Sequence, residues 1–355
     1  YFERLSPSRS VMVKVYARLA KRLLIKLKID LAIPVYLRLL EMTYDPSSKA
    51  VLYEEFYDAY KKSKLNWDIS GLAEEFSETL MQLRNSDVLS AADMAKQEKN
   101  FEVYVRDFST KLHSQAKISN RRADFEKAIS AYESFLYTFP KSKYTLKILV
   151  NQAEAYYSIR SYARAGLKYE LISRRSKKKK DYWDSSIQSY AFALKNSDKL
   201  SKLELTESRE GFREVGSSYI KTYPNDKANA MILFNIARTY YDDRDFYKAV
   251  QYFKSFINSY PKQKEVTMAG QLILDSFNQQ EDYDGMIKSG KEIVSNPSID
   301  NAQFKKDISE LVKQAEYRRI QVQVGDPKSR DYANKLMGFA QKYQGSSIGD
   351  QALFE

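Results

Sequence analysis

The segment covering residues 229–261 constrains the fold most, because it holds two amphipathic helical patterns separated by four polar residues. Apolar residues recur at helical spacing on either side of residues 242–245; they are Leu233, Ile236, Ala237 and Tyr240 before this break, and Phe246, Ala249, Val250, Phe253 and Phe256 after it. Pro261 ends the second pattern. Small side chains at 237 and 249 allow close approach of two helices. The segment is therefore predicted to form an antiparallel helical hairpin.

The second half of this hairpin recurs along the chain at nearly constant intervals of 37, 47, 37 and 37 residues. The recurring second helices begin at Asp124, Ser161, Ser208, Asp245 and Asp282. One hairpin cannot bury its apolar face alone, so repeats at a fixed interval stack on one another. The sequence predicts an all-α protein, a right-handed α-solenoid over residues 119–355. Residues 1–118 are expected to be a more divergent helical region of degenerate repeats, and a basic insert is expected around residues 173–184.

The spacing of the repeated residues resembles the second helix of a tetratricopeptide repeat (TPR). In this sequence the residues that carry the resemblance are Ala128, Tyr132, Phe135 and Pro140, and again Ala249, Phe253, Phe256 and Pro261. The resemblance implies a non-enzymatic scaffold that binds a peptide or a partner protein in a concave groove lined by the first helices. Residues 139–144 and 260–261 are similar to the bacterial envelope branch, which includes outer-membrane-assembly lipoproteins and Tol-associated periplasmic proteins. This branch implies a periplasmic or outer-membrane location; a cytoplasmic protein is the alternative.

The groove residues expected from this register face away from the contact between residues 237 and 249. In the strongest repeat they are Met231, Phe234, Arg238 and Tyr241. In an earlier repeat they are Lys147, Glu154 and Tyr157, and in the next one Gln271, Asp275 and Asn278. Aromatic and Met side chains among charges suit an extended or helical peptide. The alternative interpretation is that these residues pack against the neighbouring repeat.

The net charge of +12 favours anionic partners. The densest basic run consists of Arg174, Arg175, Lys177, Lys178, Lys179 and Lys180. Mutual repulsion is expected to keep this run extended in a loop, where it would contact an anionic membrane surface. Two alternatives stay open: a cytoplasmic TPR-like protein that binds nucleic acid through the insert, and a run that is only solvated. A basic amphipathic helix is also expected within residues 9–44, bent or restarted at Pro34.

No catalytic residue, cofactor or metal ligand is predicted. The chain has no Cys, which excludes thiolate chemistry. It has one histidine, His113, so a zinc site or a His-based triad is excluded as well, and His113 is expected to be solvated. Residues 285–291 fit the G-x4-G-K pattern, but Glu292 stands where a phosphate-binding loop needs Ser or Thr, and the stretch is predicted to be helical. Because the chain starts with Tyr1 and ends inside an apolar pattern, we expect it to be a fragment or a processed form.

Overall fold

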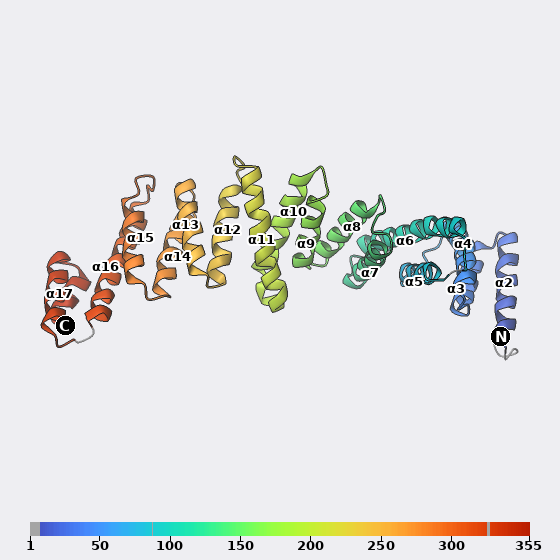
Figure 1. Ribbon diagram of the computed structural model, residues 1–355, viewed down its shortest axis with the longest axis horizontal. Helices are drawn as coiled ribbons and strands as arrows, with labels where there is room; N and C mark the ends of the chain where they lie inside the picture. The colour runs from blue at the N-terminus through green and yellow to red at the C-terminus, as the bar shows by residue number, and fades with distance from the viewer. Residues whose placement is uncertain (1–7, 87, 325–326) are drawn as a thin grey trace. The chain divides into compact units, whose positions relative to one another are not determined.

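The computed structural model describes residues 8–86, 88–324 and 327–355, and in these ranges every regular element is a helix (Figure 1). The prediction of an all-α protein is therefore confirmed. The chain divides into two compact units, Tyr1–Ser208 (unit 1) and Arg209–Glu355 (unit 2). The boundary expected between residues 118 and 119 falls at the C-terminal end of α6 (Ala91–Ser119), inside unit 1.

Unit 1 is a succession of antiparallel helices joined by short turns. Its helices are α2 (Arg9–Ile25), α3 (Ile29–Glu41), α4 (Pro46–Lys62), α5 (Leu72–Arg84), α6 (Ala91–Ser119), α7 (Arg122–Thr138), α8 (Thr145–Ser158), α9 (Tyr162–Ser173), α10 (Lys179–Lys195) and the short 3-10 helix η1 (Ser197–Lys199). Helix α11 (Lys202–Thr222) begins in unit 1 and continues into unit 2.

Unit 2 continues the same alternation. Its helices are α12 (Asn229–Asp242), α13 (Phe246–Ser259), α14 (Val266–Asn278), α15 (Tyr283–Ser295), α16 (Ala302–Val324), α17 (Arg330–Lys342) and α18 (Ser347–Phe354). The predicted hairpin of residues 229–261 is α12 and α13. Asp245 and Asp282, where second helices were predicted to begin, are the N-cap residues of α13 and α15 and accept hydrogen bonds from the backbone N–H groups of Lys248 and Gly285.

Within each unit the even-numbered helices are the first helices of the hairpins and the odd-numbered helices are the second. Each helix packs on its neighbour in sequence, and first helices also touch the next first helix, as in α4–α6, α6–α8, α12–α14, α14–α16 and α16–α18. We call the exposed surface of these touching even-numbered helices the first-helix face. This layering is that of an α-solenoid built from helical hairpins.

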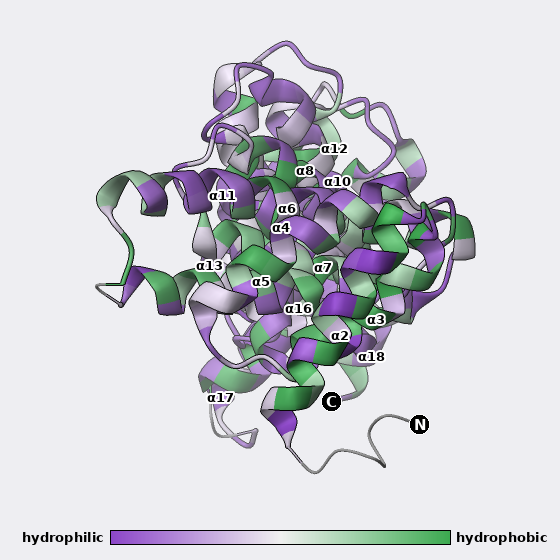
Figure 2. Ribbon diagram, turned by 90° about the vertical axis from the view of Figure 1, so that its right-hand side faces the viewer, coloured by the Kyte–Doolittle hydropathy of each residue, from purple (hydrophilic) through white to green (hydrophobic). Residues whose placement is uncertain are grey.

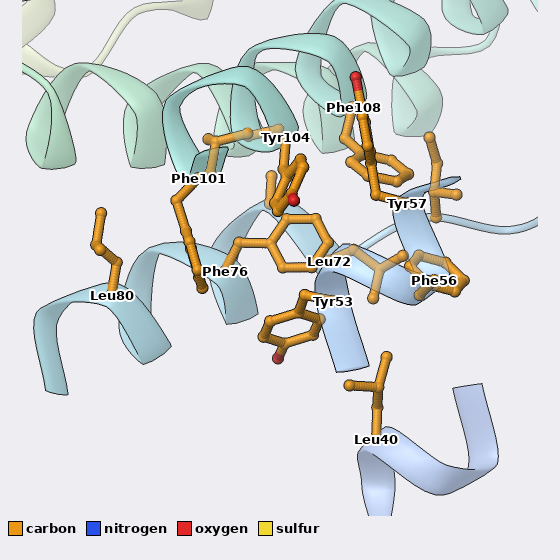
Figure 3. Packing of buried hydrophobic residues seen from close by; sticks show 14 of the residues in the cluster. Leu40, Tyr53, Phe56, Tyr57, Leu72, Phe76, Leu80, Phe101, Tyr104 and Phe108 are labelled. Carbon is orange, nitrogen blue, oxygen red and sulfur yellow. The ribbon is translucent and has the colours of Figure 1, made fainter. Parts of the chain in front are cut away.

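The core of unit 1 is unusually aromatic where α4, α5 and α6 meet (Figure 3). The rings of Tyr53 and Phe76 meet edge to face with centroids 4.4 Å apart, and Phe101 lies against both. Edge-to-face aromatic pairs add about 0.5–1.5 kcal/mol beyond the burial of their area. These rings therefore anchor the divergent N-terminal hairpins, whose sequence repeats are weak.

The core of unit 2 forms around the small residues that the sequence singled out. Ala237 and Ala249 are fully buried between α12 and α13, and Phe253 and Phe256 fill the space beside them. Gly290 permits an equally close approach of α15 to α16, since a Cβ at this position would clash with the side chain of Val312. The pattern at residues 285–291 is therefore a helix-packing feature inside α15, as the sequence predicted.

Two local expectations from the sequence need correction. The helix does not restart at Pro34, which lies inside α3; the break between helices occurs earlier, at residues 26–28, where Leu27 adopts a left-handed conformation with φ 54°. The ten additional residues of the 47-residue interval do not form a long loop either. They lengthen α10 and α11, which have 17 and 21 residues against 14 in both α12 and α13.

Candidate functional site

The first-helix face of unit 2 gathers five of the residues predicted to line a groove. Met231, Arg238, Gln271 and Asn278 are exposed on α12 and α14, and Asp275 is half-buried between them. They share one face because residues three and four apart on a helix lie on the same side. The structure therefore brings the predicted residues of two consecutive repeats together.

Tyr241 and Asp275 are in direct contact across α12 and α14. The Tyr241 hydroxyl donates a hydrogen bond to a carboxylate oxygen of Asp275. This hydrogen bond, reinforced by burial, raises the pKa of Tyr241 to about 12. Both residues were predicted to face a partner, and in the structure each is also part of the packing between neighbouring repeats. For Tyr241 and Asp275 the alternative interpretation therefore holds, namely that these residues pack against the neighbouring repeat.

The expectation that Phe234 lines the groove was wrong. Its side chain is only 4% exposed and packs between Phe253 and Phe256 of α13, with ring centroids 5.7 and 5.4 Å away. The corresponding position one repeat later is Gln271, which is exposed. Helical spacing alone places both residues on the same face; the two phenylalanines of α13 draw the ring of Phe234 inward because they offer it an apolar pocket.

The three predicted residues of the earlier repeat lie on α8, in unit 1. Lys147 is exposed, whereas Glu154 is half-buried and forms a 3.2 Å ion pair with Lys117 of α6. The ring of Tyr157 packs edge to face on Tyr162 of α9, with centroids 5.2 Å apart. Glu154 and Tyr157 thus already have partners in neighbouring helices, and Lys147 is the residue of this set that projects into solvent.

A hollow of about 500 Å³ extends the first-helix face of unit 2 from α14 over α16 to α18. The predicted residue Asn278 lies at one end of it. Polar side chains that the sequence reasoning missed line the rest, namely Glu310, Gln314, Arg318, Gln321 and Gln351. Met286 and Ile348 provide apolar surface. The signal that was available is the spacing of Gln314, Arg318 and Gln321, which places three polar side chains on one side of α16.

A buried carboxylate fixes the helices that carry this hollow. Glu316 of α16 accepts hydrogen bonds from Lys291 of α15 at 2.7 Å, from Lys342 of α17 at 2.6 Å and from the Tyr343 hydroxyl at 2.7 Å. Burial raises the pKa of this carboxyl, but the three donors outweigh burial and bring it to about 2. Glu316 is therefore ionised at neutral pH and ties three helices together.

The basic run was expected to be an extended loop, and this expectation was wrong for its second half. Helix α10 begins at Lys179, so only residues 174–178 lie between α9 and α10. Arg174 forms a 2.6 Å ion pair with Glu170, and the Lys179 ammonium lies 4.5 Å from the centroid of the Trp183 ring. These contacts neutralise part of the run, while Lys177 and Lys178 are exposed.

The single histidine is buried, contrary to the expectation of a solvated side chain. His113 is 4% exposed, and its Nδ1 lies 3.0 Å from the Tyr132 hydroxyl. Burial lowers the pKa of His113 to about 4, so the imidazole is neutral at pH 7. Among the residues that the structure describes, no group of three or more His, Cys, Asp or Glu side chains is arranged to hold a metal ion. Over the same residues no helix is both long and apolar enough to cross a bilayer.

Comparison with known proteins identifies the class of the central hairpin. Residues 232–262, which cover most of α12 and all of α13, match the tetratricopeptide repeat model. No curated protein matches the chain. Among solved structures, the chain is similar to the apo form of RapI, with 14% identity, a TM-score of 0.32, and coverage of 97% of this chain and 95% of RapI.

Two further structures show the same kind of similarity. BtubC (BKLC) from P. vanneervenii has 14% identity and a TM-score of 0.29, over 70% of this chain and 89% of BtubC. The TPR domain of P58(IPK) has 15% identity and a TM-score of 0.23, over 88% of this chain and 99% of that domain. The family model thus shows a tetratricopeptide repeat at residues 232–262, and it lies within an all-α succession of helical hairpins. These matches do not support the envelope branch of the family.

Proposed function

We propose that this chain is a non-enzymatic protein-interaction scaffold that binds an extended segment of a partner protein on the first-helix face of unit 2. The tetratricopeptide match in α12 and α13 supports this proposal, because repeats of this class present consecutive first helices as a continuous binding surface. The predicted residues Met231, Arg238, Gln271 and Asn278 are exposed on that surface.

The observation that carries the proposal is the set of side-chain amides around the hollow between α14, α16 and α18. The side-chain amides of Asn278, Gln314 and Gln351 are exposed and line a hollow of about 500 Å³. Each amide has both donors and an acceptor, which matches the N–H and C=O groups of a peptide backbone. Such a lining suits an extended chain, whose backbone groups are unpaired.

Charges at the two ends of the surface would orient the bound segment. Arg238 and Arg318 offer cations, and Glu310 offers an anion that also pairs with Lys313 at 2.6 Å, so the surface is not dominated by one sign. A mixed rim of this kind contributes more to specificity and orientation than to affinity. The partner segment is therefore proposed to be polar and extended, with an apolar side chain over Met286 or Ile348.

The test is selection of a displayed random peptide library against the purified 355-residue chain, followed by titration of a selected peptide by fluorescence anisotropy. Gln314→Ala combined with Gln351→Ala should weaken binding by about tenfold, since two buried peptide hydrogen bonds are lost. The matched control is Tyr247→Ala, which removes a large exposed side chain from the second helix α13 and should leave affinity unchanged. Equal loss in both variants, or no selected peptide, would contradict the proposal.

Nucleic-acid binding through the basic insert is the rival, and it makes a separate prediction. Phosphate contacts by Lys177 and Lys178 would produce an affinity for oligonucleotides that falls steeply with the logarithm of salt concentration. The ion pair of Arg174 with Glu170 compensates one of the charges, and the contact of the Lys179 ammonium with the Trp183 ring holds that side chain on α10. Absence of oligonucleotide binding at low salt would eliminate this rival.

We further propose, from the sequence resemblance alone, that the scaffold belongs to a bacterial cell-envelope assembly in the periplasm or at the outer membrane. The residues behind the resemblance, Phe139 and Tyr144, also have packing roles: Phe139 is buried beside Phe135, and the Arg106 guanidinium lies 4.4 Å from the centroid of the Tyr144 ring. Cell fractionation of the tagged full-length protein tests the location, and recovery in the cytoplasm would reject it.

A further inference from the structure

In unit 1, the turn from the first helix α2 to the second helix α3 places a leucine, Leu27, in the left-handed conformation. Five such turns place a residue other than glycine in the left-handed region, at Leu27, Asn120, Arg160, Arg244 and Glu281. Four of these side chains are polar, and Leu27 is the apolar one. A left-handed conformation is disfavoured for leucine, whereas asparagine tolerates it. Burial does not explain the choice of leucine, because Leu27 is 82% exposed.

Exposed aliphatic side chains recur at the first three turns that lead from a first helix to a second helix, namely α2–α3, α4–α5 and α6–α7. Ile25 is 82% exposed beside Leu27 in the turn between α2 and α3. Leu65 is exposed in the segment between α4 and α5, and Ile118, near the end of α6, is 86% exposed. Isolated exposed apolar residues are ordinary, but exposed aliphatic side chains at three consecutive turns indicate an interaction surface.

The same three turns are strongly basic. Their cationic residues are Arg22, Lys26 and Lys28 in the first turn, Lys61, Lys62 and Lys64 in the second, and Lys117, Arg121 and Arg122 in the third. In the first two turns Asp30 accepts a hydrogen bond from Ser63 at 2.5 Å, and Asp68 accepts one from the Ser70 backbone N–H at 3.0 Å. In the third turn Lys117, Arg121 and Arg122 form ion pairs with Glu154, Asp124 and Glu126, so the uncompensated positive charge lies in the first two turns. The surface formed by these turns is therefore both aliphatic and cationic.

The three turns lie next to one another within unit 1. The hydrogen bond from Ser63 to Asp30 joins the second turn to the first. The second and third turns are close enough for the charges of Lys127 and Asp124 to act on Asp68, whose pKa is lowered mainly by its hydrogen bonds from Ser70. We call this continuous surface the turn edge of unit 1. Figure 2 shows the hydrophilic and hydrophobic segments alternating along α2, which leads into the first turn.

Equivalent turns in unit 2 have the opposite character, which shows that the fold does not require basic or aliphatic residues there. The turn between α12 and α13 contains Asp242, Asp243 and Asp245, and the turn between α14 and α15 contains Glu281 and Asp282. Turn geometry is shared, since Arg244 and Glu281 have φ values of 61° and 57° against 54° for Leu27. The composition of the turn edge in unit 1 therefore serves something other than folding.

We propose that the turn edge of unit 1 docks on the surface of an anionic lipid bilayer. Ile25, Leu27, Leu65 and Ile118 enter the boundary between head groups and acyl chains, and the lysines and the arginine of the first two turns contact lipid phosphates. Aliphatic residues flanked by cations are the combination that binds at a bilayer interface. A single-stranded nucleic acid would instead need exposed aromatic rings for base stacking. This proposal does not depend on peptide binding by unit 2.

The test is co-sedimentation of the 355-residue chain with phosphatidylcholine vesicles and with vesicles in which part of the phosphatidylcholine is replaced by phosphatidylglycerol. Binding should require phosphatidylglycerol and weaken as salt is added. Ile25→Ser combined with Leu27→Asn should lower the partition coefficient about tenfold, because two aliphatic side chains no longer enter the interface. Asparagine suits the left-handed turn, so this variant should fold as well as the parent. Lys26→Glu combined with Lys28→Glu should lower the partition coefficient at least as much.

The matched control is Arg244→Asn, which makes the same kind of exchange at the same turn position in unit 2 and should leave vesicle binding unchanged. Circular dichroism melting verifies that each variant is folded. Undiminished binding by the folded Ile25→Ser/Leu27→Asn variant would overturn the proposal, as would equal binding to both vesicle types. Binding of polyglutamate in place of vesicles would assign the turn edge to an acidic protein instead.

Discussion

The hydroxyl of Tyr241 on α12 donates to the carboxylate of Asp275 on α14, and this contact joins the first helices of two consecutive repeats. The arrangement recurs: Tyr57 of α4 donates to Asp107 of α6 at 2.5 Å, and Tyr317 of α16 donates to Glu355 at the end of α18. A tyrosine hydroxyl reaching the carboxylate of the next first helix sets their separation. The same device therefore positions the first-helix face in both units.

Tyr241→Phe should lower the free energy of unfolding of unit 2 by about 1 kcal/mol, the usual net value of one hydrogen bond. The pKa of Tyr241 is about 12 in the folded state against about 10 in an unfolded chain. The unfolded state therefore loses its proton first, and stability falls as pH rises through this interval. Urea unfolding at neutral pH and near pH 11 measures both effects. The deficit of Tyr241→Phe should shrink at the higher pH, and an unchanged deficit would contradict this assignment.

Phe234→Ala and Met231→Ala distinguish a core position from a surface position on the same helix. Phe234 is buried against Phe253 and Phe256, so its truncation should cost about 3–5 kcal/mol. Met231 is 46% exposed, and its truncation should change stability by less than about 0.5 kcal/mol. Chemical denaturation followed by circular dichroism compares the two. Similar costs for both would mean that Phe234 does not pack as the structure shows.

Gly290→Ala and Gly338→Ala place the same methyl group in two different environments. At Gly290 on α15 the new Cβ would meet the side chain of Val312, so overpacking should destabilise by about 1–3 kcal/mol. At Gly338 on α17 no atom lies within 4 Å, and the exchange should stabilise by about 0.5–1 kcal/mol because alanine favours helices. Thermal melting of both variants should shift in opposite directions, and a common direction would refute the packing argument.

Glu316→Gln removes the buried charge that two lysines share. The variant should lose about 2 kcal/mol, since the charge-assisted hydrogen bonds from the exposed ammonium groups of Lys291 and Lys342 lose their ionised acceptor. Glu310→Gln is the control, because its ion pair with Lys313 is more exposed and should be worth less than about 1 kcal/mol. The depressed pKa of Glu316 adds a pH signature: its stabilisation is complete above the ordinary value of 4.5 and is lost as pH falls toward about 2. A deficit of Glu316→Gln that persists in acid would contradict this account.

The hairpins themselves could be predicted because the forces behind them are local. Apolar spacing along 229–261, the caps at Asp245 and Asp282 and the stop at Pro261 are all properties of neighbouring residues. The structure of the longer, 47-residue interval before Ser208 was harder to predict, because additional residues can extend helices or form a loop at a similar free-energy cost. These residues lie in α10 and α11 because of how the helices pack, and the repeat interval in the sequence carries no information on that packing.

The candidate site was only partly predictable for the same reason. Arg238, Asp275 and Asn278 were placed on the first-helix face by helical spacing, and the structure brings them to one surface. Phe234 and His113 were misassigned, because burial depends on which side chains a neighbouring helix presents. The amides of Gln314 and Gln351 were missed, because the hollow that unites them exists only where α16 and α18 meet.

The sequence by itself determined the all-α class, the hairpin of residues 229–261 and the repeat interval, since each follows from contacts within a few residues or between adjacent helices. Only the tertiary structure decided which exposed residues form a surface. Side chains of successive repeats become neighbours through packing, as Tyr241 and Asp275 do across α12 and α14, and Ser63 and Asp30 do at the turn edge. The physical reason is that such surfaces depend on contacts between residues far apart in the chain, which no local pattern encodes.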